Sequence, residues 1–462
     1  MQAIKKFNDS KSFVERKFSC LLIIAIIYTP SSNVNAQVSI QHSKNIIAPE
    51  LNCPAIITSN FKKNSSNIDP FEIPDDSDIL EILQEESSQK YLDKNSIEYR
   101  KKTSIPSVGL WGDSHVAAHF FTDELIKLLA VDSNQVYQKF IPPTMGRAGV
   151  RLPVKKFCKS TGWNYVAAYK DTTNNSSRGL IELESSVPQS YLWVDFRKNS
   201  DIGILNGLKI PVSISSNTTK LGISIDDQEE QLIEINKSAS YDYISIESKF
   251  SFSTIKLRLI AGQITIGGFV PIYNQLPKIY FDTFGIPGAT MNGWSKMKKL
   301  DPYDVKDSNY YDVIILEYGT NEGNDANFDP NLYRKNLHKN LEIVRSLYPD
   351  SSCILVGPTD RGILIRRSTK KVKGKTQKND LLKYSQRHKV ISSIQEEEAV
   401  KVDCNFWDWQ ESMGGLGSSY KWLKQNPQLM SKDLIHLTVK GYQVSAQKFI
   451  DRYNLTKLID KN

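Results

Sequence analysis

The sequence contains few of the residues that build metal sites. It has five cysteines and six histidines in 462 residues. The cysteines are far apart, and no two histidines fall in the HExxH pattern, which excludes the usual local zinc motifs. His115 and His119 are four residues apart and share a helical face, but no third ligand accompanies them. We therefore expect neither a metal nor a cofactor.

The chain also lacks a long apolar run and a strong charge excess. Its longest apolar stretch near the N-terminus covers residues 18–28, whereas a membrane-spanning helix needs about 20 residues. Hydrophobic residues make up 40% of the chain and charged residues 24%, with a formal net charge of +8. This composition is typical of folded domains, and so small an excess of positive charge does not by itself indicate nucleic acid binding.

The N-terminus has the pattern of an export signal. Basic residues between positions 5 and 17 precede the apolar stretch. Small and polar residues follow it as far as Ala36. We predict a signal peptide over residues 1–36, export to the periplasm or cell envelope, and no stable membrane insertion after cleavage. An uncleaved anchor is the alternative. Export permits disulfides, and the sequence does not rank the three pairings of the four remaining cysteines: Cys53, Cys158, Cys353 and Cys404.

Hydrophobic periodicity divides the mature chain into three parts. Residues 37–100 are polar and include one expected helix near 76–90, forming a lead-in segment. Residues 101–150 and 273–462 alternate strands with helices, which predicts an α/β domain with a parallel sheet and helices on both faces. Residues 151–272 carry short alternating segments separated by turns, which predicts an inserted antiparallel β-sandwich. Trp193 and Phe196 lie in these segments, and core packing is the expected role of both.

Polar residues and glycines follow the ends of predicted strands in the α/β domain. Gly-Asp-Ser-His at 112–115 joins a strand to a helix, so the serine hydroxyl lies where helical N–H groups can stabilise an oxyanion. Gly-Thr-Asn at 319–321 follows a second strand, and Gly288 lies after a third. Asp433 and His436 are spaced so that a carboxylate can orient an imidazole base. Active sites of parallel sheets form at this edge.

These four blocks, read in order, resemble the SGNH or GDSL-like hydrolases. The resemblance covers about residues 105–455. It implies that Ser114 is the nucleophile, that His436 is the base, and that Asp433 orients the base. It also implies an oxyanion hole formed by Ser114, Gly288 and Asn321. Gly285 is an alternative to Gly288, because it is only three residues away.

A narrower resemblance rests on further segments, namely Tyr-Gly-Thr-Asn-Glu at 318–322, Gly-Pro-Thr-Asp at 357–360 and the aromatic block 406–415. Together with the inserted sandwich, which is similar to a carbohydrate-binding module, they resemble bacterial peptidoglycan O-acetylesterases. Trp407, Trp409 and Gln410 are candidate substrate-binding residues, with core packing as the alternative for the tryptophans. The basic segment 366–378 departs from the family pattern; it is either an anion-binding element or a solvated loop.

The interpretation that follows is an exported serine esterase that removes O-acetyl groups from cell-wall glycan through an acetyl-enzyme. The expected partner is an O-acetylated cell-wall glycan, and no nucleic acid partner is expected. Three alternatives stay open: a peptidoglycan O-acetyltransferase, an acetyl esterase for another polysaccharide, and a non-catalytic glycan-binding envelope protein. The intact Ser114, Asp433 and His436 argue against the last of these.

Overall fold

The computed structural model describes residues 36–40, 71–74, 99, 105–168, 180–197, 204–237, 242–296, 311–366 and 381–459. Chain contacts separate Met1–Val34 from Asn35–Asn462, and every described residue belongs to the second unit. The predicted signal peptide, the expected helix near 76–90 and residues 367–378 of the basic segment lie outside the described residues. Among the described residues, no helix has the length and apolar character needed to cross a membrane.

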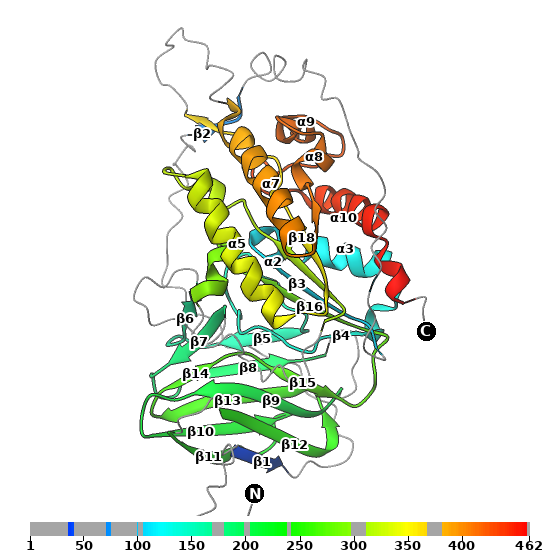
Figure 1. The fold of residues 1–462 in the computed structure, drawn as a ribbon. Helices are drawn as coiled ribbons and strands as arrows, with labels where there is room; N and C mark the ends of the chain where they lie inside the picture. Colours follow the sequence, from blue (N-terminus) through cyan, green and yellow to red (C-terminus); the bar gives the residue numbers. More distant parts are fainter. Residues whose placement is uncertain are drawn as a thin grey trace, which may run out of the picture. The chain divides into compact units, whose positions relative to one another are not determined.

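A six-stranded parallel sheet forms the centre of the α/β domain (Figure 1). Its strand order is β20-β18-β17-β3-β16-β4, and each neighbouring pair is parallel. The strands are β3 (Ser107–Gly112), β4 (Val136–Tyr137), β16 (Ile279–Gly285), β17 (Val313–Glu317), β18 (Ser352–Val356) and β20 (Cys404–Trp407). Strands β3 and β17 are buried along their whole length, which explains their nearly continuous apolar sequences.

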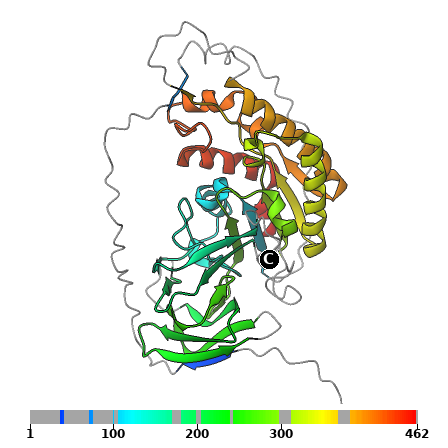
Figure 2. The ribbon, with the colours of Figure 1, turned by 90° about the vertical axis from the view of Figure 1, so that its left-hand side faces the viewer.

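Helices cover both faces of this sheet (Figure 2). The helices are α2 (Ser114–Ala117), α3 (Phe120–Leu128), α5 (Pro330–Leu347), α7 (Lys383–Lys401), α8 (Trp409–Met413), α9 (Ser418–Leu423) and α10 (Val439–Tyr453). Successive strand residues serve opposite faces. Ile315 joins the core under α3 and α10, whereas Ile314 joins the core under α5 and α7. The predicted α/β fold class is confirmed.

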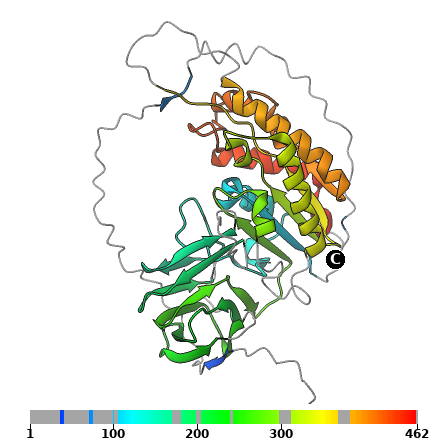
Figure 3. The same cartoon turned by 60° about the vertical axis from the view of Figure 1, so that its left-hand side comes forward.

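Two further sheets pack around a separate apolar core (Figure 3). One contains β1 (Ala36–Ile40), β12 (Asp242–Phe252), β9 (Leu205–Ser213), β14 (Ile264–Ile266), β7 (Ile181–Ser185), β6 (Asn164–Ala167) and β15 (Val270–Tyr273). The other contains β11 (Gln231–Asn236), β10 (Thr218–Ile225), β13 (Thr254–Ala261), β8 (Tyr191–Asp195) and β5 (Lys156–Lys159). The predicted β-sandwich is confirmed, and Phe196 lies in its core.

The sandwich includes a strand from the N-terminal segment, which the sequence pattern did not predict. Strand β1 pairs in parallel with β12, whereas the other pairs of the two sheets are antiparallel. The strands from β5 to β15 follow β4 and precede β16 in the chain. The boundaries 151 and 272 stay predictions. A short pair, β2 (Phe71–Glu72) and β19 (Ile365–Arg366), joins another lead-in segment to the loop after β18.

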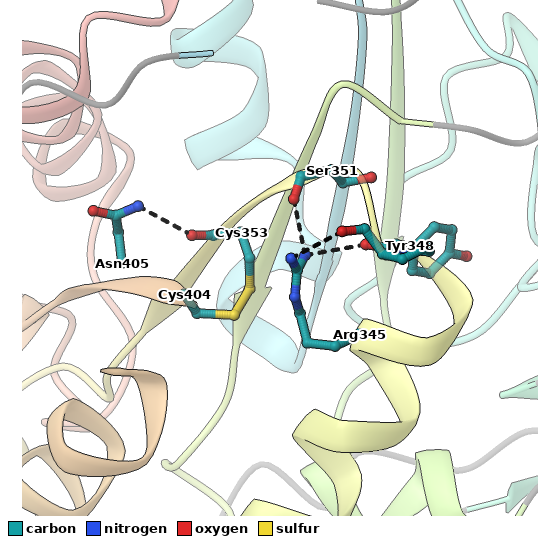
Figure 4. The surroundings of a disulfide bond; sticks show 7 residues. Arg345, Tyr348, Ser351, Cys353, Cys404 and Asn405 are labelled. Carbon is teal, nitrogen blue, oxygen red and sulfur yellow. Dashed lines mark hydrogen bonds between the residues drawn. A yellow bond between two sulfur atoms is a disulfide. The ribbon is translucent and has the colours of Figure 1, made fainter. Parts of the chain in front are cut away.

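A disulfide links two neighbouring strands of the parallel sheet. Cys353 on β18 and Cys404 on β20 are register partners, and their Cα atoms are 4.5 Å apart (Figure 4). Arg345 closes the adjacent turn, where it donates hydrogen bonds to the carbonyls of Tyr348 and Ser351 at 3.0 and 2.8 Å (Figure 4). This bond is one of the pairings that the sequence left open.

Candidate active site

The candidate site lies beyond the carboxyl ends of the central strands. Strand β3 ends at Gly112, and Ser114 begins α2 directly after it. Asp113 caps that helix, because its Oδ1 accepts a hydrogen bond of 2.9 Å from the His115 amide. Asn321 follows the neighbouring strand β17. The fold therefore brings these distant segments together at one edge of the sheet.

The predicted serine, histidine and aspartate lie in one hydrogen-bonded line. His436 Nε2 is 2.9 Å from Ser114 Oγ, and His436 Nδ1 is 2.7 Å from Asp433 Oδ2. Asp433 Oδ1 also accepts the backbone N–H groups of Ile435 and His436, each at 2.9 Å. A proton on Nδ1 faces the carboxylate, so Nε2 is left to accept the serine proton. This is the arrangement of a nucleophile, a base and a group that orients the base.

The electrostatics of the pair suit a base that works near neutral pH. Burial raises the pKa of Asp433, but hydrogen bonds from His436 and from two backbone amides outweigh it and lower that pKa to about 2. The hydrogen bond to Asp433 raises the pKa of His436 above its usual value, against the opposing effect of burial. Asp433 and His436 remain 45% and 39% exposed, so a substrate can approach them.

Two of the predicted oxyanion donors, Gly288 and Asn321, differ in their present contacts. Gly288 is exposed, with φ of 81°, a conformation that favours glycine. Asn321 Nδ2 donates to Asp113 Oδ2 at 3.0 Å and to the Ala289 carbonyl at 2.9 Å. Both amide protons of Asn321 are thus engaged. An oxyanion bound there would accept the amide proton that now goes to the Ala289 carbonyl, either in place of that carbonyl or together with it. The contact with Asp113 holds the amide in place.

Gly285, the alternative oxyanion glycine, has a packing role. It ends β16, where it pairs with Gly112 of β3. A Cβ atom at this position would lie 2.2 Å from the Ala117 backbone nitrogen. Only glycine lets α2 approach the sheet this closely. Gly288 therefore remains the better candidate for the oxyanion hole.

Three carboxyl groups lie in and around the nucleophile turn: Asp113 and Glu317 are buried, and Glu322 is half-buried. Burial raises the pKa of Asp113 to about 6 and that of Glu322 to about 7. Burial also raises the pKa of Glu317, as does the neighbouring charge of Asp113. Glu317 Oε2 accepts the Asp113 amide at 3.1 Å, and Glu322 accepts the amides of Met291 and Gly319 at 2.8 and 3.1 Å. Burial favours the protonated forms of these groups.

His115 is a buried residue beside the nucleophile, and hydrogen bonds hold its ring. Its Nδ1 is 3.0 Å from the Tyr442 hydroxyl and its Nε2 is 3.3 Å from the Thr359 hydroxyl. Burial and the charge of His436 lower its pKa well below the usual histidine value, so its ring is neutral. Among the described residues, no group of three or more His, Cys, Asp or Glu side chains could hold a metal ion.

The predicted substrate contacts of the aromatic block need correction. The side chains of Trp407, Trp409 and Gln410 are 5%, 0% and 0% exposed. The tryptophans stack in the core with ring centroids 5.4 Å apart. Gln410 Nε2 donates to Asp360 Oδ1 at 2.7 Å. None of the three side chains presents a surface to a sugar. All three belong to the buried interior of the α/β domain.

Arg361 is a residue near the site that the sequence analysis did not select. It directly follows the segment 357–360, which carries part of the resemblance. Burial lowers the pKa of Arg361, and the charge of Asp433 opposes this shift; the charge of Arg361 in turn opposes the rise in the pKa of His436. A cation in the loop that follows a parallel strand was the available signal.

Comparisons with known proteins bear on the fold. Residues 268–449 match the family model described as GDSL-like Lipase/Acylhydrolase. A solved structure described as a peptidoglycan O-acetylesterase superposes with a TM-score of 0.56 at 21% identity, covering 78% of this chain and 92% of that one. No curated protein sequence matches the chain. The predicted resemblance to GDSL-like hydrolases is confirmed by the family model and by the shared fold.

Two family 2 carbohydrate esterases show a weaker likeness. The enzyme of Corynascus thermopiles (Myceliophthora fergusii), which carries a carbohydrate-binding domain, is 12% identical, with a TM-score of 0.28. The enzyme of Cellvibrio japonicus is 10% identical, with a TM-score of 0.25. The alignments cover 65% and 66% of this chain and 98% of each of those chains.

Proposed function

We propose that this chain, whose residues 268–449 match the GDSL-like Lipase/Acylhydrolase family model, is a serine esterase that removes O-acetyl groups from cell-wall glycan. The observation that carries the proposal is the line from Ser114 through His436 to Asp433 at the edge of the sheet. The choice of substrate is supported by the likeness to a peptidoglycan O-acetylesterase over most of both chains.

The reaction proposed for this geometry has two steps. His436 Nε2 takes the proton of Ser114 Oγ as the oxygen attacks the acetyl carbonyl, and Asp433 stabilises the imidazolium that forms. The tetrahedral oxyanion lies against the Ser114 and Gly288 amides and the Asn321 side chain, each donor contributing about 3 to 4 kcal/mol to lowering the barrier. The sugar hydroxyl leaves with the proton from His436. Water, activated by the same base, then releases acetate from the acetyl-enzyme.

We also propose that the protein works outside the cytoplasm. The disulfide between Cys353 and Cys404 supports this location, because such bonds persist in oxidising compartments. The signal-like pattern of residues 1–36 points to the same place.

Acetate release tests the proposed function. Purified protein is incubated with O-acetylated cell-wall glycan and, in parallel, with the same glycan after mild base treatment, which removes the esters. We expect acetate from the first sample only, and none from either sample with Ser114→Ala. The proposal fails if the protein hydrolyses a simple aryl acetate but releases no acetate from the glycan. It also fails if the acetyl group appears mainly on an added chitooligosaccharide, which would indicate a transferase.

A further inference from the structure

Arg361 lies in the loop after β18, next to the loop that carries the catalytic aspartate and histidine. The Gly362 amide donates to the Leu434 carbonyl at 3.0 Å, so the two loops are joined by their backbones. The next amide, that of Ile363, donates to the Tyr420 hydroxyl at 2.8 Å. These bonds hold the backbone on the C-terminal side of Arg361 in place beside the loop of Asp433 and His436.

The guanidinium group of Arg361 is held by stacking and has unused donors. Its Cζ atom lies 4.1 Å from the centroid of the Tyr384 ring. Within the part of the chain that the structure describes, Nε and Nη1 are buried and have no hydrogen-bond partner. A buried N–H group without a partner is costly, and here two of them belong to one cation. Stacking on an aromatic ring does not use the N–H groups of the guanidinium, which point outward in its own plane.

Other buried or stacked arginines in the molecule are satisfied by the protein itself. Arg197 in the sandwich is buried and binds Asp195 through Nε at 2.9 Å and Nη2 at 2.6 Å. Arg387, which also lies over the Tyr384 ring, donates to the Gly323 carbonyl at 2.9 Å. Arg361 interacts electrostatically with Asp433 and His436, but the described residues include no ion-pair partner for it. It therefore differs from both by lacking an acceptor.

We propose that Arg361 is a carboxylate-binding residue beside the catalytic serine, selecting acetylated sugars that carry an acid group. The planar guanidinium matches the two oxygens of a carboxylate, which would satisfy the donors that the protein leaves unused. This inference rests on the proposed function, because it names the substrate class of the same site. In a cell-wall glycan, the acid is the lactyl ether carboxylate of a muramic acid residue that carries no peptide.

Binding to an inactive variant tests the inference separately from catalysis. The probes are the disaccharide N-acetylglucosaminyl-N-acetylmuramic acid and the same disaccharide with its lactyl carboxylate converted to the amide. Titration calorimetry with Ser114→Ala should give an affinity for the acid about tenfold or more above that for the amide. Adding Arg361→Gln should bring the two affinities within about twofold. Adding Arg334→Gln instead, which breaks ion pairs with the exposed Glu397 and the buried Glu398 on α7, should keep the preference.

Each other outcome decides against the subsite. Equal binding of acid and amide by Ser114→Ala overturns the inference, as does failure of both to bind, or a preference that survives Arg361→Gln. If thermal melting shows that Arg361→Gln is unfolded, Arg361→Lys replaces it, because it keeps the charge but loses the planar fork; an undiminished preference then overturns the inference. A wild-type protein that releases no acetate from glycan, beside an intact acid preference in Ser114→Ala, refutes the proposed function and leaves the subsite standing.

Discussion

Two aspartates flank the pair of Ser114 and His436, and their surroundings drive their pKa values in opposite directions. Asp433 is 45% exposed and accepts three hydrogen bonds from residues 435 and 436, and its pKa falls to about 2. Asp113 is fully buried, and its pKa rises to about 6 despite the hydrogen bonds that it accepts. The difference shows that burial outweighs hydrogen bonding beneath the serine, whereas hydrogen bonding outweighs burial beside the histidine.

This contrast separates two layers with different tasks. The upper layer, Ser114, His436 and Asp433, is open enough to exchange protons with a substrate and water. The lower layer consists of the buried Asp113 and Glu317 and the half-buried Glu322, and it holds backbone amides and the Asn321 side chain in position. Changes in the upper layer should therefore act on the rate, and changes in the lower layer mainly on stability.

Replacing the nucleophile should have the largest effect. Ser114→Ala removes the group that forms the acetyl-enzyme, so the kcat for an aryl acetate should fall by about a thousandfold or more. The melting temperature should stay close to that of the wild type, because the hydroxyl contacts only His436 Nε2 in the hydrogen-bond line. A variant that keeps more than about a tenth of the wild-type rate would show that another residue is the nucleophile.

Removing the charge of Asp433 should have the next largest effect. Asp433→Asn should lower kcat by about a hundredfold to ten-thousandfold, less than His436→Ala does, because it disturbs the tautomer of the base but leaves the base in place. The wild-type rate should rise with pH through an ionisation above the usual histidine pKa, since Asp433 raises the pKa of His436 and only the neutral ring can accept a proton. In Asp433→Asn this limb should move to lower pH. An unmoved limb would contradict the assignment.

A substitution of a buried tryptophan in the aromatic block 406–415 should affect stability without affecting substrate binding. Trp409 is buried, and its Nε1 donates to Ser445 Oγ at 2.9 Å. Trp409→Phe should lower the free energy of unfolding by about 1 to 3 kcal/mol, through the lost contact area and the unpaired hydroxyl. The KM for acetylated glycan should change by less than about twofold. A large increase in KM with unchanged urea unfolding would restore a direct substrate contact for this block.

Replacing a buried carboxyl group should change how stability depends on pH. The pKa of Glu317 is higher in the folded chain than in the unfolded chain, so the folded state binds more protons. The stability that Glu317 contributes to the folded chain is therefore fully present below its pKa in the unfolded chain. It is lost as the pH rises through its pKa in the folded chain. Glu317→Gln stays neutral. The free energy of unfolding, measured with urea at pH 5 and pH 8, should fall less between these two pH values in the variant than in the wild type. The difference should be about 1 kcal/mol or more.

The opposite result is informative as well. If Glu317→Gln and the wild type lost the same free energy of unfolding between pH 5 and pH 8, Glu317 would be ionised in the folded chain. Glu229→Gln serves as a matched control, because that glutamate is exposed in the loop between β10 and β11. It should leave the pH dependence of stability as in the wild type.

The sequence predicted features that depend on local pattern and missed those that depend on packing between distant segments. The residues at the strand ends were found because strand, turn and helix are each encoded locally around Ser114. The burial of Trp407 and Trp409 could not be predicted, because an aromatic side chain suits a sugar face and a core equally well. The pairing of Cys353 with Cys404 needed the order of the strands, which residue spacing does not contain. The unused donors of Arg361 needed side-chain positions.

Mass spectrometry of the protein during turnover tests the central claim most directly. The wild-type chain is mixed with an aryl acetate, quenched in acid within the first turnovers and digested. We predict one added acetyl group on the peptide that contains Ser114, and none on the same peptide from Ser114→Ala. An acetyl group on another residue, or hydrolysis without any acetylated peptide under conditions where a control serine esterase gives one, would contradict the account.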